Sequence, residues 1–246
     1  MARAEVTYLA AATAAIQDLA DAQADAIGRA ADAVAAAIAA EHRVFVASTS
    51  HVLHSELVMR AGGLAAVHAL GEPPDFTQPM LDLRAGALDA IGPFQPEAGD
   101  VVLIGTNAGT DAGTVEVALA ARAAGCVVVG LTCVAYESWP DVVRDHPTRG
   151  RLMDLSDILI DVGGVVGDGI VELPGLDVAL GPTSGVALVA AAWAILVGAA
   201  ERLLAQGLTP VAYRSVQIPG AEDLFHERRA AYEASGRGVL PTEPTA

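Results

Sequence analysis

The chain has 246 residues, a net charge of −16 at pH 7 and a hydrophobic fraction of 53%. All 14 basic residues are arginines, so the chain lacks both a Schiff-base lysine and the lysine of a Walker-type phosphate loop. The strong acidity argues against a surface that binds nucleic acid or an anionic membrane, because both need basic patches.

Cysteine usage and hydropathy predict a cytoplasmic protein. Cys126 and Cys133 flank a predicted buried strand and are expected to be small core residues in a reducing compartment. Glu5 and Gln17-Asp18 interrupt the apolar N-terminal stretch, which does not have the layout of a signal peptide. The longest uncharged apolar run, residues 185–200, is short for a membrane span, so we expect no membrane association.

Residues 5–40 read as a long alanine-rich helical region. Apolar residues recur at helical spacing, with Asp18, Asp21 and Asp25 between them. A helix of this length ahead of the first strand favours packing on a partner subunit, and we expect a homodimer or homotetramer. The alternative is a surface helix that covers its own sheet.

The rest of the chain alternates apolar, β-branched runs with helical patterns. We expect strands at residues 43–47, 65–70, 101–104, 127–132 and 158–162, and helices at 51–61, 81–91, 184–206 and 221–235 as well as directly after Asp111. This alternation predicts an α/β fold with a doubly wound, five-stranded parallel sheet in the order 2-1-3-4-5, flanked by helices. Residues 1–235 would form one domain, and residues 236–246 a flexible tail.

Two polar loops fall where such a sheet binds ligands. In the order 2-1-3-4-5 the connections change direction between the first and third strands, and ligands bind there, beyond the carboxyl ends of the strands. The loops at this point are residues 48–51 and 105–111. In the second loop, Gly105 and small polar residues lead to Asp111, which can cap the next helix. Free N–H groups and hydroxyls at such a junction suit an anion, typically a phosphate, although packing alone also explains the composition.

Short polar and glycine-rich motifs follow several of the predicted strands. They are Ser50-His51, Glu56, Arg60 to Gly63, Thr106 to Gly109, Leu131-Thr132, Asp157 to Asp161, Gly163-Gly164, Gly167-Asp168 and Gly181 to Ser184. In this order they resemble the sugar isomerase (SIS) domain family, in a single-domain bacterial branch near phosphoheptose isomerase and the muramic acid phosphate etherases. Ala108 stands where that family usually has a second serine in its phosphate loop.

The resemblance implies an isomerase that interconverts an aldose and a ketose sugar phosphate. That reaction needs a base that moves a proton between adjacent carbons and a donor that polarises the carbonyl. We assign the base to Glu56, where burial would raise the pKa of its carboxyl group, and the donor to His51. The alternatives are a solvated helix carboxylate and a histidine that only hydrogen-bonds its loop.

The remaining candidate site residues are polar groups of the predicted loops. The resemblance assigns the binding of the sugar phosphate to Ser48, Thr49, Ser50, Thr106, Asn107, Gly109, Thr110, Asp168, Thr183 and Ser184, with His226 reaching a neighbouring subunit's pocket. His54 and His68 are expected to be structural. No cofactor and no metal is expected, because the spacing of His51, His54 and Glu56 is not characteristic of zinc sites. A non-catalytic phosphosugar sensor, and a lyase or etherase that uses the same carboxylate, are the alternative functions.

Overall fold

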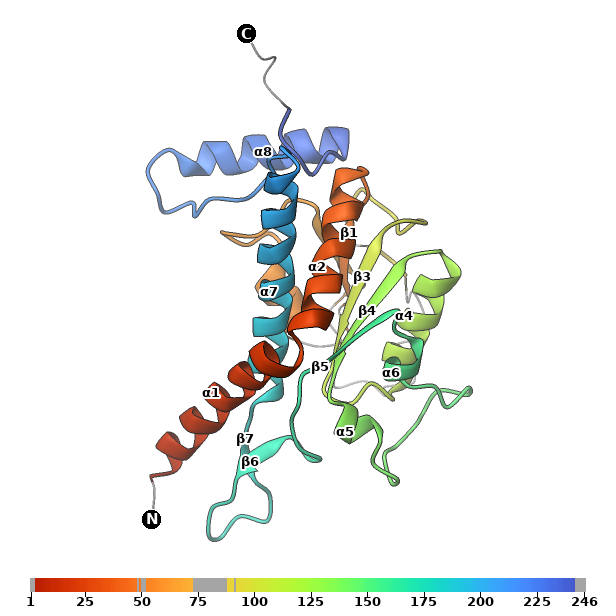
Figure 1. The fold of residues 1–246 in the computed structure, drawn as a ribbon, viewed down its shortest axis with the longest axis vertical. Coiled ribbons are helices and arrows are strands. Elements are labelled where there is room, and N and C mark those ends of the chain that lie inside the picture. Colours follow the sequence, from red (N-terminus) through yellow and green to blue (C-terminus); the bar gives the residue numbers. More distant parts are fainter. Residues whose placement is uncertain (1–2, 48, 50–51, 73–87, 91, 242–246) are drawn as a thin grey trace.

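A five-stranded parallel sheet lies at the centre of the protein (Figure 1). The structure, a computed structural model, describes residues 3–47, 49, 52–72, 88–90 and 92–241. The strands are β1 (Val44–Ala47), β2 (Val67–Leu70), β3 (Val101–Gly105), β4 (Val127–Thr132) and β5 (Ile158–Asp161). They pair in the order β2-β1-β3-β4-β5, which confirms the predicted doubly wound sheet.

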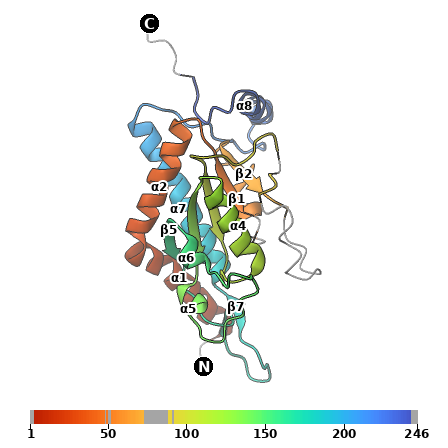
Figure 2. The same cartoon turned by 90° about the vertical axis from the view of Figure 1, so that its right-hand side faces the viewer.

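Helices cover both faces of this sheet (Figure 2). α2 (Ala24–Ala39), α3 (Leu53–Leu57) and α7 (Ser184–Ala205) lie on one face, and α4 (Ala112–Ala123) and α6 (Leu152–Leu155) on the other. Along β1, Val44 and Val46 belong to the core on the α2 and α7 side, whereas Phe45 and Ala47 belong to the core on the other side. Burial of both faces explains why the strands read as continuous apolar runs rather than as alternating patterns.

The predicted N-terminal helix is divided in two at Gln23. The Gln23 side chain accepts a hydrogen bond from the Asp161 N–H (3.2 Å), which joins this break to the end of β5. Before it, α1 (Ala4–Ala22) packs along the first part of α7 and a small hairpin of β6 (Gly169–Val171) and β7 (Leu180–Pro182). The Tyr8 hydroxyl donates to the Pro182 carbonyl (3.1 Å) and fixes α1 to this hairpin.

The C-terminal helix α8 (Ala221–Ser235) lies at the amino edge of the sheet, opposite α5 (Val134–Glu137), which follows β4 (Figure 1). The segment after α8 returns to the body, because the Leu240 N–H donates to the Thr209 carbonyl (2.7 Å). The prediction of a flexible tail from residue 236 is therefore wrong as far as Leu240. Residues 242–246, and most of the helix predicted at 81–91, lie outside the described residues.

Among the described helices, α7 alone is long and apolar enough to cross a membrane by length and composition. Its inward side chains, which include Ala191, Ile195 and Ala199, are fully buried in the core on the α2 side of the sheet. Core helices of soluble proteins pass the same test of length and composition. The packing of α7 against α2 is that of a core helix.

Candidate functional site at the carboxyl edge of the sheet

The topological switch point lies between β1 and β3, where the sequence places two polar loops. Ser48, Ser50 and His51 of the first loop lie outside the described residues, so their predicted roles stay predictions. Thr49 is described, and its hydroxyl oxygen is buried without a hydrogen-bond partner. The second loop is described in full.

The loop between β3 and α4 is held by contacts with α3, with β4 and with the first turn of α4. Gly105 packs so tightly beneath Leu53 that a Cβ added there would overlap the leucine side chain. The Thr106 N–H donates to the Leu131 carbonyl (3.0 Å) of the neighbouring strand. The Asp111 carboxylate accepts the Thr114 N–H (2.8 Å), which confirms the predicted cap of α4.

Two residues of this loop that were predicted to bind the ligand, Thr110 and Asn107, differ in whether their side chains already have a partner. Thr110 is buried, and its hydroxyl donates to the Val143 carbonyl (2.7 Å), so the structure gives it an internal partner. Asn107 keeps a free acceptor, since its Oδ1 is buried and unpartnered. A Cβ added at Gly164 would lie 3.6 Å from both Asn107 Oδ1 and Cys133 Sγ. The ends of β3, β4 and β5 thus converge at Asn107.

The turn after β5 meets the start of α7. Asp168 adopts a left-handed backbone conformation (φ 67°), and its Oδ2 accepts the Ser184 hydroxyl (3.1 Å). Its Oδ1 is buried without a partner. Thr183 is buried at the N-cap of α7 and makes no side-chain capping bond. The Thr183 hydroxyl, the Asp168 carboxylate and the first N–H groups of α7 therefore lie together near the same edge.

Unpartnered polar atoms concentrate at this carboxyl edge. Among the described residues, seven buried side-chain nitrogen or oxygen atoms lack a hydrogen-bond partner, and five of them follow or end a strand of the main sheet. The five belong to Thr49, Asn107, Thr132, Glu137 and Asp168. Since buried polar groups in proteins are nearly always paired, each such atom needs an explanation. The Thr132 hydroxyl and the Glu137 carboxyl group interact with each other. For Thr49, Asn107 and Asp168, a polar ligand bound across these loops would supply the missing partners.

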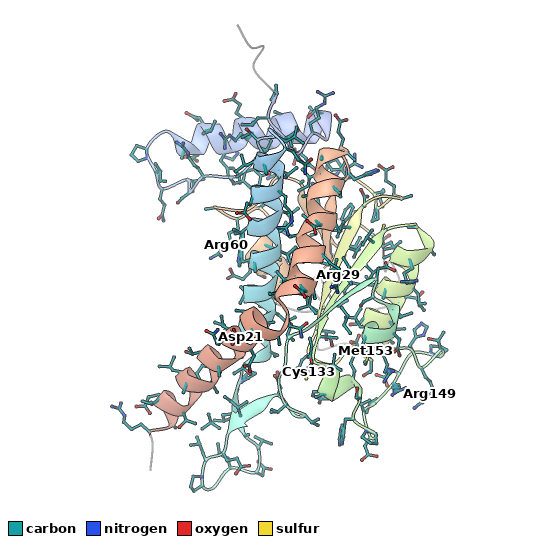
Figure 3. The ribbon with its side chains drawn as sticks, in the orientation of Figure 1. Asp21, Arg29, Arg60, Cys133, Arg149 and Met153 are labelled. Atoms are coloured by element: carbon teal, nitrogen blue, oxygen red, sulfur yellow. The ribbon has the colours of Figure 1, made fainter. Side chains whose placement is uncertain are left out.

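A cavity of about 290 Å³ lies near Asn107, between α1 and the turn after β5. Its walls are alanines of α1, Asp18 and Gln23 on one side and the segment from Asp161 to Gly164 on the other. Gly164 therefore separates the cavity from Asn107. In Figure 3, Cys133 marks the same lower edge of the sheet.

Glu56 differs from expectation in its surroundings. Its side chain is 35% exposed and pairs with Arg60 (3.2 Å), one turn along the chain. The reason is the short helix α3, whose buried side is taken by Leu53 and Leu57, so Glu56 is turned outward. The predicted burial of this carboxylate is wrong, and its role as a base stays a proposal.

His226 lies apart from the site residues that the structure describes at the carboxyl edge. It belongs to α8 at the amino edge and contacts the Phe225 ring edge-on (centroids 5.5 Å apart). Within one subunit it does not meet the loops of the site. Its predicted reach into a neighbouring subunit stays a prediction.

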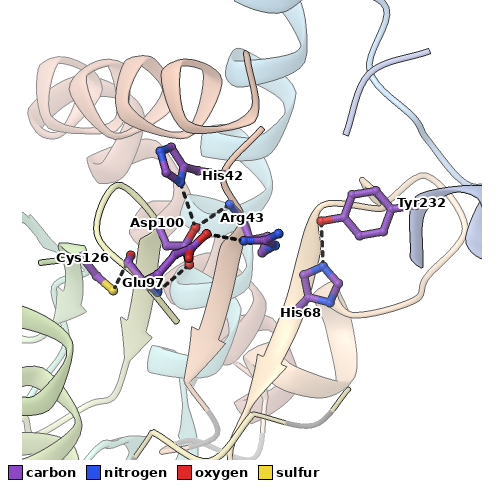
Figure 4. Close-up of polar contacts among 7 residues, drawn as sticks. All are labelled: His42, Arg43, His68, Glu97, Asp100, Cys126 and Tyr232. Atoms are coloured by element: carbon purple, nitrogen blue, oxygen red, sulfur yellow. Dashed lines mark hydrogen bonds and ion pairs between the residues drawn. The ribbon is translucent and has the colours of Figure 1, made fainter. Parts of the chain in front are cut away.

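The amino edge also holds a group with metal-binding chemistry. His42, Glu97 and Asp100 place three potential ligand atoms within 4.8 Å of one another (Figure 4). Both Asp100 oxygens, however, accept backbone N–H groups, from Arg43 (2.8 Å) and Glu97 (2.9 Å). The Glu97 carboxylate pairs with the Arg43 guanidinium (2.7 Å). These contacts explain the cluster without an ion.

Comparison with known proteins agrees with the fold. A model of the SIS domain family matches residues 7–133, a little over half of the chain. This chain belongs to the SIS domain family. The UPF0309 protein of Streptomyces griseus is 33% identical over 214 residues, covering 82% of this chain and 84% of the relative. The UPF0309 protein of Brucella canis is 33% identical over 215 residues, covering 80% and 82%.

A solved structure shares the architecture of this SIS domain. It is a protein of Escherichia coli CFT073 in complex with a sugar phosphate, with a TM-score of 0.50 and 13% sequence identity. The match covers 79% of this chain and 87% of that one. At this level of identity the likeness shows the fold alone.

The SIS domain also holds a carboxylate that the sequence did not mark. Glu137 is fully buried at the end of α5, and one of its oxygens is among the unpartnered atoms of the edge. A signal was present, since an acidic residue five positions beyond the end of a parallel strand lies on the ligand side of such a sheet. Its burial depends on α6 and could not be read from α5.

Proposed function

We propose that this SIS domain binds a phosphorylated sugar at the carboxyl edge of its sheet and interconverts its aldose and ketose forms. The proposal rests on one observation, the unpartnered polar atoms of Thr49, Asn107 and Asp168 gathered beyond the ends of β1, β3 and β5. Hydroxyls and phosphate oxygens of a sugar phosphate offer both donors and acceptors for such atoms. That the Escherichia coli protein of this fold was solved with a sugar phosphate is a reason to test this class of compound first.

In the proposed reaction, Glu56 removes the proton from the carbon beside the carbonyl. The electron pair of that C–H bond forms the double bond of an enediol, while a donor, assigned to His51, protonates the carbonyl oxygen. Return of the proton to the neighbouring carbon, with loss of the other hydroxyl proton, gives the isomeric sugar. Acid and base groups of this kind each contribute about 10²–10⁴ in rate.

A non-catalytic binding role is the second candidate. The observation that favours it is the Glu56–Arg60 ion pair, because the Arg60 guanidinium occupies the carboxylate that catalysis would need. Catalysis by Glu56 would require Arg60 to release it or to turn toward the substrate with it. A sensor needs only the binding groups of the loops.

The test combines binding with proton exchange. Wild type, Glu56→Gln and Glu233→Gln are screened by thermal shift against sugar phosphates, with inorganic phosphate and unphosphorylated sugars as controls. Glu233 is a matched control, because it also forms an ion pair one turn away, with Arg229 (2.8 Å), but on α8 at the opposite edge. A ligand that binds the native state raises the melting temperature. Exchange of carbon-bound hydrogen is then followed by NMR in deuterated water.

We expect a sugar phosphate to stabilise all three proteins and only Glu56→Gln to lose exchange. Stabilisation without exchange in wild type would establish the binding role instead. Exchange followed by loss of a substituent would indicate a lyase or etherase. If no phosphorylated compound stabilises wild type, the sugar phosphate is the wrong ligand class.

We also propose that the protein is a homodimer or homotetramer joined through α1 and α7. Val197 and Leu204 of α7 and Leu9 of α1 are 66%, 57% and 62% exposed. No charged residue occurs from Ser184 to Ala200. Since copies with a charge of −16 repel one another, an uncharged apolar face is the surface on which a second copy can approach.

A further inference from the structure

Glu137 is an acidic residue at the carboxyl edge that is completely enclosed by protein. Its side chain has no solvent exposure, although it lies only five residues beyond the end of β4. Its Oε2 accepts the Met153 N–H (3.0 Å) at the start of α6, on the side of the sheet where Figure 3 labels Met153. The Thr132 hydroxyl lies close to this carboxyl group, but Oε1 lacks a well-formed hydrogen bond.

The unpartnered oxygen lies against the loop between β3 and α4. A Cβ added at Gly109 would overlap Glu137 Oε1 and would lie 2.5 Å from the Leu152 Cβ. The Leu152 N–H donates to the Gly109 carbonyl (2.7 Å). Gly109 is thus held by a hydrogen bond from α6 and supported from beneath by the Glu137 carboxyl group, and only a glycine fits between them.

Burial of Glu137 disfavours the charged form of its carboxyl group. Burial raises the pKa of the Glu137 carboxyl group, against the opposing effects of the Thr132 hydroxyl, the Met153 N–H and Arg151. Arg151 does not pair with it directly, since its guanidinium donates twice to Asp154 (2.6 and 2.8 Å).

We propose that Glu137 is a positioning residue of the sugar-phosphate site. Through Gly109, it fixes the loop from Thr106 to Asp111 in the conformation that presents Asn107 and the backbone N–H groups to the anionic part of the ligand. The proposal rests on the proposed function for the identity of the ligand. It adds that ligand affinity depends on a carboxyl group that does not touch the ligand.

The first measurement examines the loop in the unliganded protein. Hydrogen–deuterium exchange of peptides covering residues 105–114 is compared in wild type, Glu137→Ala, Glu137→Gln and Asp100→Asn. Asp100 is the control, because it is also a fully buried carboxylate but lies at the amino edge. We expect exchange in the loop to be at least tenfold faster in Glu137→Ala and near wild type in the other two. Unchanged exchange in Glu137→Ala would overturn the proposal.

The second measurement uses inorganic phosphate, and the best sugar phosphate of the thermal-shift panel, as probes in isothermal titration calorimetry. We expect Kd to rise at least tenfold in Glu137→Ala and by less than threefold in Glu137→Gln, which keeps an acceptor for the Met153 N–H. A purely structural role would lower stability and leave Kd unchanged. If Glu137→Ala does not fold, Gly109→Ala tests the same contact by forcing the loop away from Glu137.

Failure of the positioning role can be distinguished from failure of the proposed function. If wild type binds a probe and Glu137→Ala binds it equally well, only the positioning role is refuted. If wild type binds neither phosphate nor any sugar phosphate, the proposed function fails, and the positioning role in ligand binding is refuted with it.

Discussion

Acid should destabilise the attachment of α8 through His68. The His68 Nε2 lies 2.9 Å from the Tyr232 hydroxyl, and the two rings stack with centroids 5.3 Å apart (Figure 4). Phe94 contacts the imidazole edge-on (5.2 Å). Burial lowers the pKa of His68 to about 4, and the nearby Arg43 acts in the same direction. The folded protein therefore holds this imidazole neutral.

The direction and size of this loss of stability follow from proton linkage. Between pH 6.5 and 4 the unfolded chain binds a proton at His68 that the folded protein does not, so the free energy of unfolding rises with pH in this window. The stabilisation is fully present above pH 6.5 and is lost progressively as the pH falls toward 4. From a pKa of 6.5 unfolded and about 4 folded, the loss between pH 7 and pH 5 is about 2 kcal/mol.

Urea unfolding at pH 7, 6 and 5, at one fixed protein concentration, measures this loss. The comparison is wild type against His68→Gln, which keeps a polar partner for Tyr232 but does not titrate. Carboxylates and the other histidines titrate alike in both proteins, so their contribution cancels. We expect wild type to lose about 2 kcal/mol more than the variant over this range. Equal pH dependence in the two proteins would refute the assignment of a buried, neutral His68.

Three further predictions concern stability and assembly. Asp111→Ala removes the cap on the Thr114 N–H (2.8 Å) and should cost about 1 kcal/mol, or roughly 2–4 °C in Tm, whereas Asp111→Asn should keep most of it. Gly105→Ala should cost roughly 1–3 kcal/mol in urea unfolding, since the new methyl group would overlap Leu53 and lie 3.2 Å from Leu188; a neutral effect would show that α3 can shift. Val197→Asp should halve the molecular mass measured by light scattering. The control Val143→Asp, at an equally exposed valine (69%) in a loop, should leave the mass unchanged. An unchanged mass in both variants would refute the α7 interface.

The sheet could be predicted from the sequence because its signals are local. β-branched runs such as Val127 to Thr132 mark each strand, and glycine or proline bounds it. The order of strands then follows from the alternation with helices. The hairpin of β6 and β7 was missed, because its strands of three residues each carry no periodic pattern and pair across a loop.

The site could be predicted in part. The positions of the loops after β1 and β3 follow from topology, which brings the carboxyl ends of parallel strands to one edge. The contact between Asp168 and Ser184 was not predicted, because it depends on how the hairpin of β6 and β7 returns to α7. The environment of each carboxylate could not be predicted from topology. Glu56 is turned outward because α3 buries Leu53 and Leu57, and Glu137 is buried because α6 folds over it. Both outcomes depend on contacts between segments that no local pattern encodes.

The two edges of the sheet differ in how their polar groups are satisfied, and this difference separates structural from ligand-binding roles. Asp100 at the amino edge accepts the N–H groups of Arg43 and Glu97. Asp100→Ala leaves both donors open and should cost roughly 2–6 kcal/mol of stability, at about 1–3 kcal/mol each. Asn107 at the carboxyl edge has a buried oxygen that no group of the described chain uses. Asn107→Ala should therefore change stability little, by less than about 1 kcal/mol, and weaken sugar-phosphate binding at least tenfold. Urea unfolding and calorimetry on both variants check this contrast, and a large loss of stability in Asn107→Ala would mean that its oxygen serves the fold instead of a ligand.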